Sequence, residues 1–284
     1  MFESLESIVN ECREKGLSFP DLVIQNEMRS SDAPTEKIYA RMKKMWDAML
    51  SASENYDGDL VSRSGLSGGD GKRFQSYSEG GNSVCGPFIS NVISEALKMA
   101  ESNACMKRIV ASPTAGSCGV LPSVLIPLHR DGKFSEEKII KSLFVAAGIG
   151  QVIAIRASIS GAEGGCQAEI GSASAMAAGA LVYLYGGSDF QICNAVGFAL
   201  QNLLGLVCDP VAGLVEIPCV KRNVIGAVNA CSCADMVLAG IEPKIPADEI
   251  IDAMRYVGAK MDVSLKETGT GGVAGSVTAR SFAI

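Results

Sequence analysis

The sequence predicts a mainly α-helical protein built around a buried pair of central helices. Three observations support this fold class: apolar residues recur at helical spacing in several segments, two long runs contain no charged residue, and no alternating strand pattern reaches a convincing length. With 284 residues, 48% of them hydrophobic, the chain can bury a sizeable core. We expect a compact multi-helix fold, with an N-terminal helical segment at 1–56 packed on a domain at 57–284.

The first helices are predicted close to the N-terminus. Residues 3–15 have a helical pattern that stops at Gly16, and a polar stretch follows at 25–31. Pro34 suits the first turn of the next helix. Its methionine-rich apolar stripe is best interpreted as core packing rather than as a cofactor site. The stripe consists of Ile38, Met42, Met45 and Met49.

Residues 57–87 are rich in glycine, serine and charged residues, and we predict a long loop there. Helical patterns return from Pro87 onward. Ser135 is a suitable N-cap for one of these helices, because Glu136 and Glu137 are favoured by the helix dipole in the first turn. The remaining helices are predicted at 135–147, 167–185, 190–206, 223–239 and 247–260.

The two uncharged runs, 170–188 and 190–208, approach the ~20 residues of a membrane span. Glycine, alanine and serine dominate the first run, and four amide side chains interrupt the second. A single Asp189 between them gives no positive-inside signal. We therefore predict a buried hairpin of two central helices, with a membrane protein as the rival interpretation.

The charge balance and the cysteine content restrict the possible functions. The net charge is −6, and no basic cluster is present that could neutralise a run of phosphates, so we expect no nucleic-acid partner. Residues 1–13 mix acidic side chains into the apolar ones, unlike a signal peptide, so we expect a cytoplasmic protein. In that reducing compartment the ten cysteines are not expected to form disulfides, which leaves metal ligation, catalysis or burial.

Three of the cysteines stand at predicted helix ends or turns. Cys166 follows a glycine turn and opens a helix, whose N-terminus favours the thiolate form that binds metal. Cys208 follows the second central helix, and Cys219 follows Pro218. No Cys-x-x-Cys pattern occurs, which argues against the common zinc-ribbon and ferredoxin spacings. Taken alone, each of the three is equally consistent with an ordinary buried cysteine.

Five motifs, in one order along the chain, carry a resemblance to a known family. They are Ser-Gly-Leu-Ser-Gly-Gly-Asp-Gly-Lys at 64–72, Ala-Ser-Pro-Thr-Ala-Gly-Ser-Cys-Gly-Val-Leu-Pro at 111–122, Gly-Ala-x-Gly-Gly-Cys-Gln-Ala-Glu-Ile-Gly at 161–171, Val-Cys-Asp-Pro-Val-Ala-Gly-Leu-Val-Glu-Ile-Pro-Cys at 207–219 and Lys-Arg-Asn at 221–223. The sequence resembles the iron–sulfur L-serine dehydratases, and within them the alpha chain of the two-chain type. The resemblance implies a [4Fe–4S] cluster on Cys166, Cys208 and Cys219, with one iron that lacks a cysteine ligand.

The same resemblance implies a lyase that converts L-serine to pyruvate and ammonia, with residues 57–284 as the cluster-binding catalytic domain. In such a site, an iron with an open position acts as a Lewis acid on the leaving hydroxyl group. The glycine-rich loops would then line the active site, and the stretch 269–275 is a flexible tail or a substrate-side loop. Turn formation explains each candidate substrate-binding side chain equally well. The candidate groups are Ser64, Ser67, Lys72, Thr114 and the backbone N–H groups near Gly116.

The catalytic base stays unknown at this level. The one histidine, His129, is predicted in an exposed turn after a short helix, and relatives carry a histidine-containing loop in a second chain or domain. We therefore expect a beta subunit to supply the base. Two other functions stay open: an L-cysteine desulfidase of related type, and a non-catalytic iron–sulfur module for electron transfer or regulation.

Overall fold

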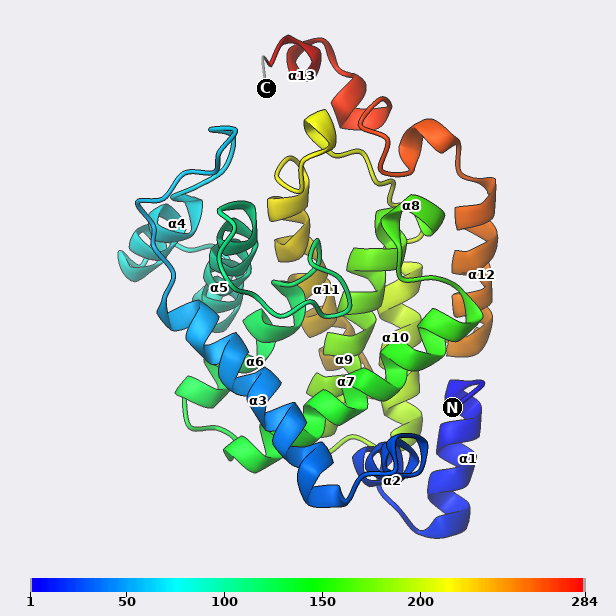
Figure 1. Ribbon diagram of the computed structural model, residues 1–284. Coiled ribbons are helices and arrows are strands. Elements are labelled where there is room, and N and C mark those ends of the chain that lie inside the picture. The colour runs from blue at the N-terminus through cyan, green and yellow to red at the C-terminus, as the bar shows by residue number, and fades with distance from the viewer. Residues whose placement is uncertain (1, 283–284) are drawn as a thin grey trace.

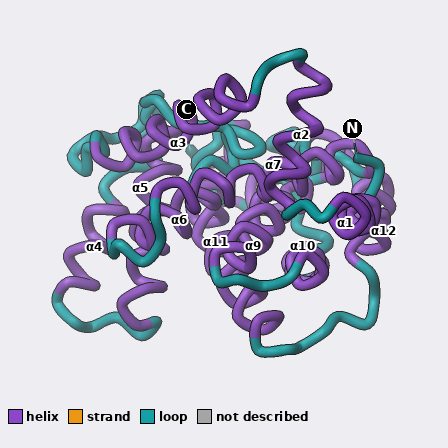
Figure 2. The backbone as a smooth tube through the Cα atoms, turned by 90° about the horizontal axis from the view of Figure 1, so that it is seen from below, coloured by secondary structure: helices purple, strands orange, loops and turns teal. Residues whose placement is uncertain are grey.

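The computed structural model describes residues 2–282, and helices make up nearly all of the secondary structure in this range (Figure 1, Figure 2). The predicted mainly α fold is confirmed. The α-helices are α1 (Leu5–Lys15), α2 (Phe19–Ser31), α3 (Thr35–Glu54), α4 (Asp70–Glu79), α5 (Gly86–Ala104), α6 (Val120–Arg130), α7 (Glu136–Arg156), α8 (Gly161–Gly164), α9 (Ser172–Leu184), α10 (Asp189–Gln201), α11 (Cys219–Leu238), α12 (Ala247–Lys260) and α13 (Val277–Ser281). Four shorter turns accompany them: the π-helix η1 (Gln167–Gly171) and the 3-10 helices η2 (Val211–Gly213), η3 (Val263–Leu265) and η4 (Gly272–Gly275).

Helix α9 lies at the centre of the fold, and every one of its residues except Tyr183 is buried. It packs against α7, α10, α11 and α6, as Figure 1 shows. Its small side chains allow this close packing, because a methyl group on Gly179 would lie only 2.2 Å from Cδ1 of Ile149 in α7. The predicted central hairpin is therefore present as α9 and α10.

One helix, α7, is long and apolar enough to cross a membrane when judged by length and composition alone, and 61% of its apolar window is buried inside the structure. Its N-cap is Ser135, as predicted, and the Ser135 hydroxyl accepts a hydrogen bond from the N–H of Lys138. The helix continues to Arg156, well past the predicted end at 147, because its second half is also buried between neighbouring helices.

The N-terminal helices share the main core with the rest of the chain. Helix α1 ends at Gly16, whose left-handed backbone (φ +63°) fits the predicted stop. Helix α2 was not predicted, since its polar second half resembles a loop. Its first half buries Phe19 and Leu22, and these join Trp46 of α3 in the same hydrophobic cluster.

Two residue-level predictions are wrong. In α3, Met45 is 42% exposed, whereas the neighbouring Trp46 is fully buried. The buried face of the helix is therefore turned by about one residue from the predicted face. His129 does not lie in an exposed turn. It is half-buried in the last turn of α6, and its ring meets Trp46 edge-on with 5.5 Å between the ring centroids.

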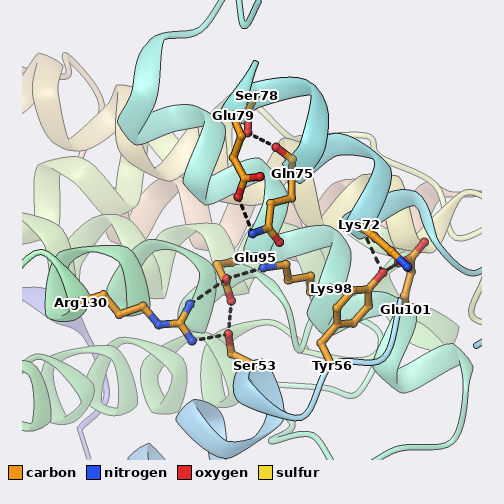
Figure 3. A network of polar contacts seen from close by, with 10 residues as sticks. All are labelled: Ser53, Tyr56, Lys72, Gln75, Ser78, Glu79, Glu95, Lys98, Glu101 and Arg130. Carbon is orange, nitrogen blue, oxygen red and sulfur yellow. Dashed lines mark hydrogen bonds and ion pairs between the residues drawn. The ribbon is translucent and has the colours of Figure 1, made fainter. Parts of the chain in front are cut away.

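Helix α4 interrupts the long loop that the sequence predicted. Its N-cap residue, Gly69, has no side chain with which to cap the helix. Glu101 of α5 replaces it: this carboxylate accepts hydrogen bonds from the N–H groups of Asp70 (2.7 Å) and Gly71 (3.1 Å) and from the Tyr56 hydroxyl (2.6 Å). Figure 3 shows the Tyr56–Glu101 contact. A cap from another helix explains why the local sequence does not reveal α4.

A second buried carboxylate joins three helices. Glu95 of α5 is 4% exposed and lies between Arg130 of α6 at 2.9 Å, Lys98 at 3.2 Å and the Ser53 hydroxyl of α3 (Figure 3). A carboxylate at this depth is tolerated only when cations and donors surround it. The network therefore fixes α3, α5 and α6, the scaffold on which α4 and its preceding loop rest.

Candidate functional site

The three predicted cysteines lie on segments that meet at one end of the molecule, where the C-terminal segment also lies (red in Figure 1). Cys166 stands between α8 and the π-helix η1, a rare helix type found frequently at functional sites. Gly165 before it has φ +76°, and a methyl group there would lie 2.6 Å from Met261. Only glycine fits this turn, which places Cys166 at the start of the π-helix.

Cys208 lies in the loop after α10, and the C-terminal segment holds its backbone. The Cys208 N–H donates to the carbonyl of Leu265 at 2.8 Å, and its carbonyl accepts from the N–H of Glu267 at 2.7 Å. Among residues 2–282 this is the only bridge of β type, formed by Cys208 and Lys266 in parallel. Glu267 has φ +63°, which is uncommon for a residue with a side chain.

Cys219 is the first residue of α11 and is half-buried, while Cys166 and Cys208 are 3% and 4% exposed. Burial raises the pKa of Cys166 to about 12 and that of Cys219 to about 11. Burial also raises the pKa of Cys208, and negative charge on either of the other two cysteines adds to that shift. Cys166 and Cys219 therefore lie close enough to Cys208 for their charge to act on it.

Arg222 of α11 lies among these cysteines and is only 9% exposed. One guanidinium nitrogen donates to the carbonyl of Val207 at 2.7 Å, and the other pairs with Asp209 at 2.8 Å, so Arg222 holds both neighbours of Cys208. Its positive charge and a hydrogen bond also oppose the upward shift in the pKa of Cys166. The guanidinium thus provides a positive charge at a site where three thiolates would otherwise repel one another.

The predicted tail at 269–275 also belongs to this site. The N–H of Val273 donates to Oδ2 of Asp209 at 2.6 Å. Gly272 has φ +57°, and a methyl group there would lie 2.2 Å from that same oxygen. This close packing beside Cys208 argues against a flexible tail, and the role as a substrate-side loop stays a prediction.

Asn223 joins the Pro-Thr-Ala-Gly loop to α11 and is 1% exposed. Its side-chain oxygen accepts from the N–H of Gly119 at 2.8 Å, and its nitrogen donates to the carbonyls of Gly116 at 2.8 Å and Cys219 at 3.0 Å. One amide therefore fixes the position of a candidate substrate loop relative to a candidate ligand.

Glu169, which the sequence motifs did not single out, stands between that loop and the cysteines. A methyl group on Gly161 would lie 3.0 Å from Oε2 of Glu169 and 2.9 Å from Sγ of Cys208, so the two side chains flank one small space. A methyl group on Gly116 would lie 3.3 Å from the same oxygen. Burial raises the pKa of Glu169, a hydrogen bond from Thr114 opposes this shift, and the charge of Glu267 adds to it. The position three residues after Cys166, on the same helical side, is the sequence signal that could have found it.

Of the remaining candidates, Ser64 and Ser67 lie on the glycine-rich loop before α4, and Lys72 lies in the first turn of α4. The Ser64 hydroxyl bonds to both oxygens of the buried Glu216, at 2.9 Å and 2.8 Å, so it anchors the loop three residues from Cys219. Ser67 is 4% exposed, and its hydroxyl has no hydrogen-bond partner among the described residues. Lys72 is exposed and pairs with Asp59 at 2.7 Å. The structure thus brings Thr114 and Gly116 next to the cysteines, and it directs Lys72 to the surface.

Cysteine thiolates are the ligand type that holds iron–sulfur clusters. In residues 2–282 no three His, Cys, Asp or Glu side chains are arranged to hold one metal ion. In an iron–sulfur cluster each cysteine binds a different iron, so its ligands lie further apart than those of one ion. Three thiols from separate elements, with a guanidinium that offsets their charge, have the donor chemistry of such a cluster.

The fold is that of a mainly α-helical protein, and the segments that carry the three candidate cysteines meet at one end of it. Comparison with known proteins identifies it further: the chain belongs to the serine dehydratase alpha chain family, which matches residues 14–274.

Individual relatives agree with this assignment. The chain is 45% identical to the "probable L-serine dehydratase, alpha chain" of Bacillus subtilis (strain 168), over 99% of this chain and 94% of the relative. It is 42% identical to the "L-serine dehydratase, alpha chain" of Peptoniphilus asaccharolyticus, over 99% and 97% of the two chains. It is also 37% identical to the "L-serine dehydratase TdcG" of Escherichia coli (strain K12), where it covers 96% of itself but only 61% of the relative.

Proposed function

We propose that this chain is the alpha subunit of a cytoplasmic L-serine dehydratase, which converts L-serine to pyruvate and ammonia with a [4Fe–4S] cluster on Cys166, Cys208 and Cys219. The observation that carries the proposal is that the three thiols lie near Arg222 and Glu169, in a chain of the serine dehydratase alpha chain family. When bound, such a cluster offers an iron without a cysteine ligand as a Lewis acid for the hydroxyl group of the substrate.

The residues of this chain hold and shape the site in this proposal. Asn223 keeps the Pro-Thr-Ala-Gly loop at the start of α11, so that Thr114 and the backbone N–H groups near Gly116 can bind the substrate. The Ser64–Glu216 contact keeps the glycine-rich loop beside Cys219. The C-terminal segment covers Cys208 and Asp209 and limits the access of water to the site.

A beta subunit completes the site in the proposal and provides the base for the α-proton. Two relatives carry the words "alpha chain" in their names, and this chain spans only 61% of the length of TdcG. Moreover, the one histidine of the chain, His129 in α6, packs against Trp46 of α3 and does not lie on a cysteine-bearing segment. The partner is therefore the expected source of a base active at neutral pH.

The test is anaerobic purification of this chain together with its candidate beta chain, followed by measurement of bound iron and of pyruvate formed from L-serine. We expect about four irons per alpha chain and pyruvate with an equal amount of ammonia. L-Cysteine, assayed for sulfide release, and L-threonine serve as competing substrates. An iron-loaded complex that forms no pyruvate from L-serine would contradict the proposal, and preferential release of sulfide would assign the related desulfidase activity instead.

A further inference from the structure

The Glu169 carboxyl group forms no ion pair within the described chain. The ion pairs within residues 2–282 do not include it. Arg222, which lies among the candidate cysteines, is already engaged by Asp209, Val207 and Cys166. A partly buried carboxylate without a cation is unfavourable, so it is the kind of group that a cationic ligand stabilises.

The neighbours of Glu169 fix the position of its carboxylate. The Thr114 hydroxyl lies close enough for hydrogen bonding to lower the pKa of Glu169, and the same hydroxyl lies 3.1 Å from that of Ser117. On either side the backbones of Gly116 and Gly161 approach so closely that a methyl group on either would press against the carboxylate. The carboxylate is therefore positioned by tight packing before any ligand arrives, which lowers the entropy cost of binding.

A second carboxylate, that of Glu267, lies near Glu169 and makes a bound cation more favourable there. Glu267, on the segment that holds Cys208, lies close enough for its charge to act on Glu169, and it forms no ion pair within the described chain. Its positive φ is a backbone conformation that non-glycine residues adopt at a cost, often at functional positions. The surroundings of Cys208 therefore include two carboxylates, those of Glu169 and Glu267.

We propose that Glu169 is a specificity-determining residue that binds the α-ammonium group of the amino-acid substrate, with Thr114 holding its carboxylate in place. This inference rests on the proposed function and adds to it the group that distinguishes an amino acid from a hydroxy acid. A site built to bind an ammonium group rejects an analogue without one, because its buried carboxylate then stays unpaired.

The experiment compares ligands with and without an ammonium group on the complete two-chain, iron-loaded complex. L-Alanine carries the ammonium group but no hydroxyl, and 3-hydroxypropionate carries the hydroxyl but no ammonium group. Their inhibition constants and the KM for L-serine are measured for wild type, Glu169→Gln, Thr114→Val and Glu163→Gln. Glu163 is the matched control: it is an exposed carboxylate of the same segment, bonded to Ser158 at 2.6 Å.

For Glu169→Gln we expect the KM for L-serine and the inhibition constant of L-alanine to rise about 10- to 100-fold, the loss typical of a hydrogen bond to a charged group. The inhibition constant of 3-hydroxypropionate should change by less than about twofold. Thr114→Val should give a smaller loss of the same kind, which preserves the test if Glu169→Gln binds less iron. Glu163→Gln should behave like wild type.

Two results would overturn the inference. Equal weakening of all three ligands would show a general structural role, and a fall in kcat with unchanged affinities would assign Glu169 to proton transfer. Both results need a wild-type complex that dehydrates L-serine. A wild-type complex without that activity contradicts the proposed function itself, so the two failures are distinguishable.

Discussion

Arg222 and Asp209 form an ion pair of 2.8 Å in which the two side chains are 11% and 1% exposed. The pair connects the helix that begins at Cys219 with the loop that carries Cys208, and the second oxygen of Asp209 extends the connection to Val273. Removing one partner from a buried pair leaves an uncompensated charge, so this contact is expected to matter more than any ion pair on the surface.

We therefore expect Arg222→Met to lower the free energy of unfolding by about 3–5 kcal/mol, measured by urea denaturation of the cluster-free chain. Arg222→Lys keeps the charge but loses the two-sided contact, so it should fall between Arg222→Met and wild type. Lys43→Ala removes a cation from an exposed pair with Asp47 and should leave stability nearly unchanged. Equal effects of the Arg222 and Lys43 substitutions would refute this view of the pair.

The proposed ligands can be separated from other buried cysteines by iron content. Cys166→Ala, Cys208→Ala and Cys219→Ala should each reduce bound iron in anaerobic preparations from about four per chain to near zero. Cys12 and Cys231 are 2% and 6% exposed, so their alanine variants are controls of similar burial and should retain the iron. Retention of full iron in all five variants would show that the ligand assignment is wrong.

The buried thiol of Cys118 predicts a particular pH dependence of stability. Burial raises the pKa of Cys118 to about 12 from an ordinary value of 9.0. Between these values the unfolded chain has lost the thiol proton while the folded chain retains it, so the free energy of unfolding falls as pH rises. One such group contributes a slope of up to about 1.4 kcal/mol per pH unit.

The measurement is urea denaturation of wild type and Cys118→Ala at several pH values above 8. The stability advantage of wild type over the variant should shrink steadily as pH rises, since alanine cannot ionise. Cys85 is exposed, and Cys85→Ala should show a pH dependence parallel to that of wild type. A constant difference between wild type and Cys118→Ala would mean that Cys118 ionises alike in both states.

The last prediction concerns the proposal that the alpha chain binds the cluster while the beta chain supplies the base. The alpha chain alone should bind iron but dehydrate L-serine very slowly, and addition of the beta chain should restore turnover. His129→Ala should leave the reconstituted activity nearly intact, while the loss of its contact with Trp46 costs about 0.5–1.5 kcal/mol of stability. Full turnover by the lone chain that His129→Ala abolishes would place the base in this subunit.

The local sequence was sufficient to predict a helix where that helix contains its own capping residues and apolar periodicity. The predicted limits of α12 match the structure at Ala247–Lys260, and Ser135 caps α7 as expected. The local sequence did not predict α4, whose N-terminus is capped by Glu101 of another helix. It also did not predict α2, because the second half of α2 is polar although its first half is buried. In both cases the deciding interaction joins residues that no local window contains.

In the candidate site, too, the contacts that the sequence did not predict join residues far apart in the chain. The motifs around the three cysteines single them out only through their resemblance to a known family, and their assignment as ligands stays a prediction. The placement of Glu169, and the contacts of Arg222 with Asp209 and Val207, arise only when distant segments pack together. Lys72 shows the converse, because its motif suggested the site while its side chain pairs with Asp59 at the surface.

The hydrogen bonds that hold Cys208 also set an order of events during synthesis. Both partners, Leu265 and Glu267, leave the ribosome after Cys166, Cys208 and Cys219 have already emerged. The helical core around α9 can form from the earlier part of the nascent chain, since domains fold as their N-terminal parts appear. The two hydrogen bonds to the backbone of Cys208 therefore cannot both form until translation passes residue 267. Delivery of a metal centre would have its natural moment in that interval, before the last segment docks and closes the entrance.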